Sequence, residues 1–185
     1  GDNNVAVGYV AGDALTTGGS NVAIGKSALT ADTLGSTSIA IGDSALGTQN
    51  FTTATNAYNV AIGHQAGVLV TTGIRNTLIG GLTGDALTTG NNNTALGFNA
   101  LAADTLGDRA VAIGVDALAA QNFTTTTDNY NVGIGFQAGG AVTSGVHNVL
   151  IGGLAGDAIT GGARNTAVGT FALTNDTQGA RNTAM

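Results

Sequence analysis

The sequence contains no cysteine, no proline and no tryptophan, and only 9% of its residues are charged. Without cysteine there is no disulfide and no thiolate metal site. Glycine is abundant, at 31 of 185 residues, but it does not recur at every third position. Together with the absence of proline, this excludes a collagen triple helix. The low charge and the positive mean hydropathy of +0.24 argue against disorder.

Basic clusters and long apolar runs are also missing. The five Lys and Arg residues and the net charge of −6 exclude a nucleic-acid groove. No apolar run approaches the roughly 20 residues that span a bilayer, and no basic-then-apolar leader opens the chain. Small residues dominate instead, and these suit a thin rod of stacked layers better than a globular core. The composition therefore favours a rod.

One short phrase recurs through the whole chain, as NVAIG, NTLIG, NTALG and close variants. Its copies start at residues 4, 21, 38, 59, 76, 93, 110, 131, 148, 165 and 182, so most units have one length and two are longer by the same amount. The segment ADTLGSTSIAIGDSALGTQNF from Ala31 returns as ADTLGDRAVAIGVDALAAQNF from Ala103. Four units therefore form a super-repeat.

The common 17-residue unit is too short for a strand–helix repeat but suits a strand followed by a polar turn and a return strand. The sequence therefore predicts an all-β fold, a parallel β-solenoid (β-roll) with 17- and 21-residue coils. Residues 1–185 form a single repeat region of about 10.5 coils. Because neither end carries a polar cap, we expect this region to be part of a longer fibre.

The heading strand alternates between two kinds of side chain. In the copy that starts at Asn21, we expect Val22 and Ile24 to face the coil interior and Ala23 and Gly25 to face outward. An outward face of small apolar residues requires a cover, and a second copy of the same surface is the natural one. The pattern thus predicts a homo-oligomer without fixing its copy number.

The NVAIGxxA and NTALGxxAL repeats resemble the head repeats of YadA-like trimeric adhesins. They are more similar still to the NTAxG repeats in tail-fibre proteins of phages and phage-like elements, and the resemblance covers Asn4 to Met185. It implies a left-handed parallel β-roll, an intertwined or side-by-side homotrimer, and an extracellular role in a virion tail fibre or on a bacterial surface. The partner it implies is a host-surface glycan or protein receptor, with no membrane insertion.

Asparagine heads nine of the eleven strand phrases. A stacked row of asparagines can hydrogen-bond along a solenoid, so we interpret these residues as a structural ladder rather than as an ion site. The ladder comprises Asn4, Asn21, Asn59, Asn76, Asn93, Asn131, Asn148, Asn165 and Asn182.

Aspartates and histidines form no metal-binding or catalytic pattern. The aspartates recur at two phases of the super-repeat. Aspartates of the same phase lie four coils apart, about 19 Å along the rod, which is too far to share a cation and favours turn capping. His64 and His147 occupy different phases, so no metal array is expected. No histidine–carboxylate pair stands out. We expect no enzyme activity, no catalytic residues, no cofactor and no metal.

The two long units carry the sharpest functional candidates. Their four extra residues must bulge from the wall, and each bulge brings one Phe and one Tyr into a stretch of Thr and Asn. These rings either close the lip of the bulge, pack between chains, or contact a glycan or other receptor. The candidate contact residues are Phe51, Tyr58, Phe123 and Tyr130.

Three functions are compatible with this pattern. The first is a structural fibre segment that displays or forms a receptor-contacting surface, and the second is a carbohydrate-binding adhesin head that uses the bulges. The third and most remote is an ice-binding solenoid, which requires threonine at one phase of nearly every coil. Thr16, Thr33, Thr53 and Thr72 drift in phase, which argues against it.

Overall fold

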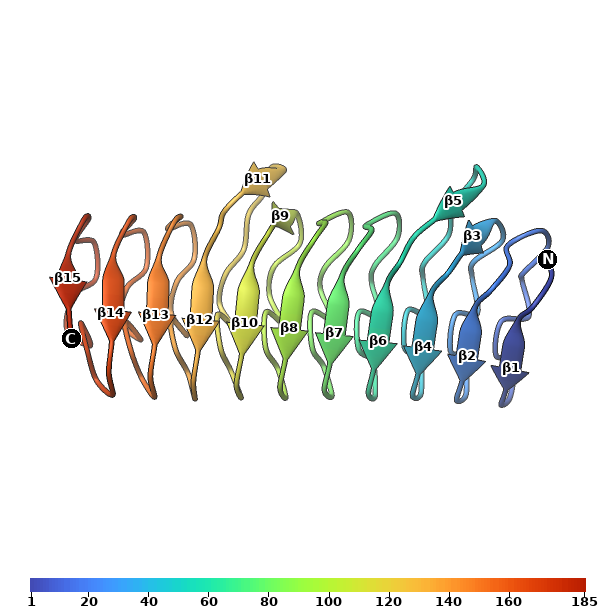
Figure 1. Cartoon of the computed structure of the whole chain (residues 1–185), viewed down its shortest axis with the longest axis horizontal. Helices are drawn as coiled ribbons and strands as arrows, with labels where there is room; N and C mark the ends of the chain where they lie inside the picture. The colour runs from blue at the N-terminus through green and yellow to red at the C-terminus, as the bar shows by residue number, and fades with distance from the viewer.

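The computed structural model describes all 185 residues as an all-β rod, with the two termini at opposite ends of its long axis (Figure 1). Eleven short strands lie side by side in one parallel sheet, one strand for each coil. No helix is present of the length and apolarity that crossing a membrane requires. The strands, in sheet order, are β1 (Val5–Val7), β2 (Val22–Ile24), β4 (Ile39–Ile41), β6 (Val60–Ile62), β7 (Thr77–Ile79), β8 (Thr94–Leu96), β10 (Val111–Ile113), β12 (Val132–Ile134), β13 (Val149–Ile151), β14 (Thr166–Val168) and β15 (Thr183–Ala184).

The repeat sets the register of this sheet. Val22 of β2 pairs with Ile39 of β4 across one regular unit, and Ile39 pairs with Val60 of β6 across one long unit. The predicted coils are thus confirmed as turns of a parallel β-solenoid. The four extra residues leave the wall as bulges, where β5 (Thr55–Asn56) pairs with β3 (Gly35–Ser36) and β11 (Thr127–Asp128) with β9 (Gly107–Asp108). Both bulges protrude on the edge where the main strands begin, the upper edge in Figure 1.

The assignment of the two strand faces from sequence was wrong. Ala23 is 1% exposed and lies inside the coil, whereas Val22 and Ile24 are only partly buried and face outward. The interior is too narrow for two facing rows of branched side chains, so volume rather than hydrophobicity decides which face is inside. The outer face is therefore the valine and isoleucine face.

We number coil positions from 1 at the heading residue, so that positions 2 to 4 form the strand. Two kinds of coil share the interior. Five coils carry a buried or partly buried leucine at position 9 and a polar side chain at position 12 (Leu29/Asp32, Leu46/Gln49, Leu101/Asp104, Leu118/Gln121, Leu173/Asp176). The other five carry glycine at position 9 and an apolar side chain at position 12 (Gly12/Leu15, Gly67/Val70, Gly84/Leu87, Gly139/Val142, Gly156/Ile159). The two kinds alternate in pairs along the rod, which explains in packing terms why four coils form the super-repeat.

Candidate functional site

The heading asparagines bind backbone groups of their own coil and of the next coil. Asn76 is typical: its Oδ1 accepts a hydrogen bond from the backbone N–H of Asn93 at 3.0 Å, and its Nδ2 donates to the carbonyl of Gly90 at 2.8 Å. These side chains hydrogen-bond mainly to the backbone. Only one hydrogen bond joins the side chains of two heading asparagines, from Nδ2 of Asn93 to Oδ1 of Asn76 at 3.2 Å. Each buried amide therefore links two successive coils.

The two coils without a heading asparagine are the two that bulge. Ser38 and Ala110 head them, and the bulge displaces the glycine turn whose carbonyl an asparagine would bind. In the second bulge, Asn129 supplies the missing acceptor: its Oδ1 lies 2.9 Å from the backbone nitrogen of Asn131. The Nδ2 atom of Asn129 is the one buried side-chain polar atom of the chain without a partner.

The aspartates at position 12 are interior groups that cap turns. Asp104 accepts hydrogen bonds from the backbone N–H groups of Gly107 and Phe123 and, at 2.6 Å, from the Nε2 atom of Gln121. The Oε1 atom of Gln121 in turn accepts from Nδ2 of Asn131 at 2.8 Å. Burial raises the pKa of the Asp104 carboxyl above its ordinary value, an effect that these donors partly offset. This buried series of hydrogen bonds holds the bulge onto the rod and leaves no open space for a substrate.

The aspartates at position 10 are exposed or partly exposed, unlike the interior Asp104. Asp13 and Asp157 accept hydrogen bonds from the hydroxyls of Thr30 and Thr174 in the following coil. Burial raises the pKa of Asp85 at the same position. No group of three or more His, Asp or Glu residues in the chain is arranged to hold a metal ion.

The candidate rings of the bulges separate into two kinds. Phe51 and Phe123 are only 5% and 7% exposed, so they pack beneath the bulges. Tyr58 and Tyr130 are 53% and 48% exposed and stand at the last position before a heading asparagine. Of the four aromatic residues singled out from sequence, the two tyrosines are therefore the ones accessible to a ligand.

The last position of each coil forms a further site, which was not predicted from sequence. All four arginines of the chain occupy it, together with both of these tyrosines and one histidine. This position could have been found in the sequence, because nearly all of the basic residues stand at this one phase of the repeat. We call its continuous C-terminal part the edge row, five residues from consecutive coils: Arg109, Tyr130, His147, Arg164 and Arg181.

Contacts within the edge row join cationic and aromatic groups. The Arg109 guanidinium lies 5.6 Å from the ring centre of Tyr130 and forms an ion pair with Asp128 of the bulge. The rings of Tyr130 and His147 are 5.4 Å apart between centroids, with an angle of 34° between their planes. Every member of the row is exposed.

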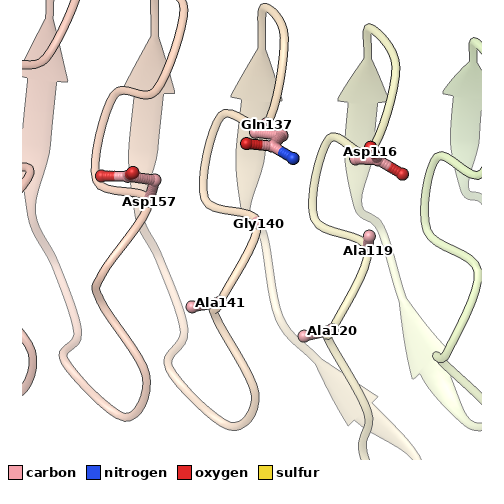
Figure 2. A pocket seen from close by; sticks show the side chains of 7 residues that line it. All are labelled: Asp116, Ala119, Ala120, Gln137, Gly140, Ala141 and Asp157. Atoms are coloured by element: carbon pink, nitrogen blue, oxygen red, sulfur yellow. The ribbon is translucent and has the colours of Figure 1, made fainter.

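A shallow hollow of about 590 Å³ lies across three coils, with Asp116, Gln137 and Asp157 along one side (Figure 2). Its floor is made of small residues, among them Gly140 and Ala141. One super-repeat earlier the same two positions hold Val68 and Leu69. The hollow thus arises where large side chains are replaced by small ones, and its carboxylates have no cationic partner.

Threonine occupies one phase more regularly than was expected from sequence. Position 13 is threonine in eight coils and asparagine in the two long ones (Thr16, Thr33, Asn50, Thr71, Thr88, Thr105, Asn122, Thr143, Thr160, Thr177). Most of these hydroxyls donate to a carbonyl of the following coil, as Thr88 does to Thr105 at 2.9 Å. The column is in register, but most of its hydroxyl donors are taken up by bonds to the next coil, although the threonines themselves are exposed or partly exposed.

No known protein family matches this chain, and neither the curated proteins nor the solved structures contain a match to it. We therefore infer function from the geometry of the rod itself.

Proposed function

We propose that this chain is a segment of an extracellular fibre or adhesin of the phage tail-fibre type, in which three copies with left-handed coils pack side by side. It is a structural element that carries a receptor-contacting surface on its edge. A carbohydrate-binding adhesin head is the alternative within the same architecture, and an ice-binding solenoid is the remote one.

The outer strand face carries this proposal. Positions 2, 4 and 6 of successive coils align into one stripe, and ten of the fourteen exposed large apolar side chains of the chain lie on it (Val5, Val7, Tyr9, Ile39, Leu96, Phe98, Val115, Phe136, Val168, Met185). The area of the stripe is roughly 600 Å², given a strand spacing of about 4.8 Å and a rise of about 3.3 Å per residue. Monomeric soluble proteins rarely expose a contiguous apolar patch larger than this.

A second copy of the same chain is the cover that best fits this stripe. The stripe follows the full length of the rod and repeats with the coil spacing, so two or three copies can align coil by coil. Lys26 and Asp43 are its only charged residues, and an interface core with few charges is typical of obligate oligomers. Rigid parallel rods joined in this way form a stiff shaft, which suits a fibre.

The mass of the purified segment tests the proposal directly. Light scattering coupled to size exclusion should give three copies for the wild type. Ile62→Glu combined with Ile113→Glu should give one copy with unchanged strand content by circular dichroism, because both side chains are already partly exposed. The matched control places two glutamates on the bulges, Thr53→Glu with Thr125→Glu, and should stay trimeric. A monomeric wild type would overturn the covered face, and two or four copies would overturn the trimer.

A further inference from the structure

We propose that the edge row binds a linear acidic polysaccharide, with the arginines holding the carboxylates of its sugars and Tyr130 lying against a sugar face. This inference rests on the proposed function, because it supplies the receptor-contacting surface of the fibre. The row runs along the edge from which the bulges protrude, and its five members come from five consecutive coils (Figure 1).

The placement of charge supports this site. The chain has eleven acidic residues and only five basic ones, so every arginine has an excess of carboxylates with which to pair. Yet one ion pair forms in the whole chain, between Arg109 and Asp128. Arg164 and Arg181 are exposed and have no carboxylate within bonding distance. Unpaired guanidinium groups in an acidic protein point to an anion from outside the chain.

The backbone geometry of the row does not dictate which residue stands there. Arg109, Arg164 and Arg181 have φ angles of 63°, 59° and 61°, in the left-handed region that glycine and asparagine adopt more readily. Asn92 occupies the same position in another coil, at φ 59°. Ser20, Thr37 and Arg75 adopt the same geometry at this position, so the turn itself does not require arginine.

The spacing of the row fits an extended ligand. The row residues other than Tyr130 are fixed by their backbone N–H groups, which donate to the preceding coil. Examples are His147 to Asn129 at 2.7 Å, Arg164 to Val146 at 2.9 Å, and Arg181 to Ala163 at 3.0 Å. Successive members are one strand spacing apart, so the row presents its groups in single file over about 19 Å. A rigid single file matches an extended polymer and is much too narrow for a folded protein surface.

The chemistry of the row selects among polyanions. Nucleic acid is bound by broad basic surfaces, whereas this chain has net charge −6 and a row one residue wide. In an acidic polysaccharide, carboxylates alternate with uncharged ring faces. Guanidinium groups bind carboxylates through two parallel hydrogen bonds, and an exposed tyrosine ring packs against a flat apolar face. The row contains both kinds of group, with Tyr130 next to Arg109 at one end and Arg164 and Arg181 at the other.

Calorimetric titration of the intact chain tests the inference with three probes: an oligogalacturonate, its uncharged methyl ester, and a single-stranded DNA of equal charge. The oligogalacturonate should bind, and the ester and DNA should not. Arg164→Gln with Arg181→Gln should raise the dissociation constant by roughly tenfold for each arginine lost. Arg75→Gln is the matched control, because Arg75 holds the same coil position but is separated from the row by Asn92. It should bind like the wild type.

Contrary results separate the ways in which the inference can fail. Absence of oligogalacturonate binding, or equal binding of DNA, overturns the site as an acidic-sugar site. An equal loss in Arg75→Gln shows a general charge effect and overturns the row. The mass of every variant is measured alongside, and a change of mass in the Arg164/Arg181 variant overturns the sugar site by showing that the row is a contact between copies. A trimer that binds no probe refutes only this inference, whereas a monomer refutes the proposed function.

Discussion

The Oδ2 atom of Asp104 lies 2.6 Å from the Nε2 atom of Gln121, and the two side chains belong to adjacent coils in the buried interior. Asp104 has no cationic partner there, and burial raises its pKa above the ordinary 3.8. The folded state therefore binds the proton of this carboxyl more tightly than the unfolded state does.

The contribution of Asp104 to the stability of the rod should consequently decrease as the pH rises. Stability contributed by this group is greatest below about pH 3.8, and it is lost as the pH rises through the higher folded-state pKa. Urea unfolding at a series of pH values measures the free energy of unfolding of the wild type and of Asp104→Asn. As the pH rises, the wild type should lose stability relative to the variant. Asp2→Asn removes the same charge from an exposed position and should show no such trend. A pH-independent difference for Asp104→Asn would contradict the prediction.

Leu78 restricts position 9 to glycine in two coils. A Cβ atom added to Gly84 would lie 2.9 Å from the Cδ2 atom of Leu78, and the φ of Gly84 is +55°. Gly84→Ala should therefore lower the free energy of unfolding by about 1 to 3 kcal/mol through overpacking. Leu78→Ala alone should cost about 2 to 5 kcal/mol because it leaves a cavity. The loss of unfolding free energy in the double variant should be smaller than the sum of the losses in the two single variants. Additive losses in urea unfolding would argue against the contact.

The buried amide of Asn76 satisfies one donor and one acceptor of the backbone. Asn76→Ala leaves the N–H of Asn93 and the carbonyl of Gly90 without partners, so we expect a loss of about 2 to 5 kcal/mol in the free energy of unfolding. Hydrogen exchange should accelerate first at Asn93. Asn175 is exposed and makes no side-chain hydrogen bond, so Asn175→Ala is the matched control and should change stability little.

A bulge should be removable without loss of the fold. Replacement of residues 51–58 by Thr-Gly-Asn-Asn, together with Ser38→Asn, gives the third coil the turn found at Thr89 to Asn92. The new asparagine then has a glycine carbonyl to bind, as in the regular coils. We expect an unchanged circular dichroism spectrum and one cooperative unfolding transition. A collapsed spectrum would show that Phe51 and its bulge are needed for folding.

The sequence predicted the architecture well because one period governs every coil. The spacing of the heading phrases translates directly into the parallel register of Val22, Ile39 and Val60. The strand faces were inverted because hydrophobicity alone places Val22 and Ile24 inside. The limited volume of the coil interior can be inferred from the sequence only by comparing two positions of the same coil. Where position 3 is leucine, as at Leu78 and Leu150, position 9 is glycine, as at Gly84 and Gly156.

The candidate site was predicted only in part. The bulges drew attention to Tyr58 and Tyr130, but aromatic content cannot show that Phe51 and Phe123 turn inward. The edge row crosses five coils and combines different residue types, so a search for a repeated motif passes over it. Grouping residues by coil position rather than by identity would have found it.

The alternation of the two coil kinds bears on how such a rod can change its length. A Cβ atom on Gly67 would lie 2.7 Å from the Cδ1 atom of Leu78 in the next coil, so a leucine-bearing coil cannot directly precede β7. Loss of the coil that begins at Asn59 would bring Leu46 directly before β7 and create this clash, whereas exchange in blocks of four coils keeps every neighbour compatible. Genetic variants of this rod should therefore differ in length by whole super-repeats, and gradual growth coil by coil is disfavoured by the packing of its interior.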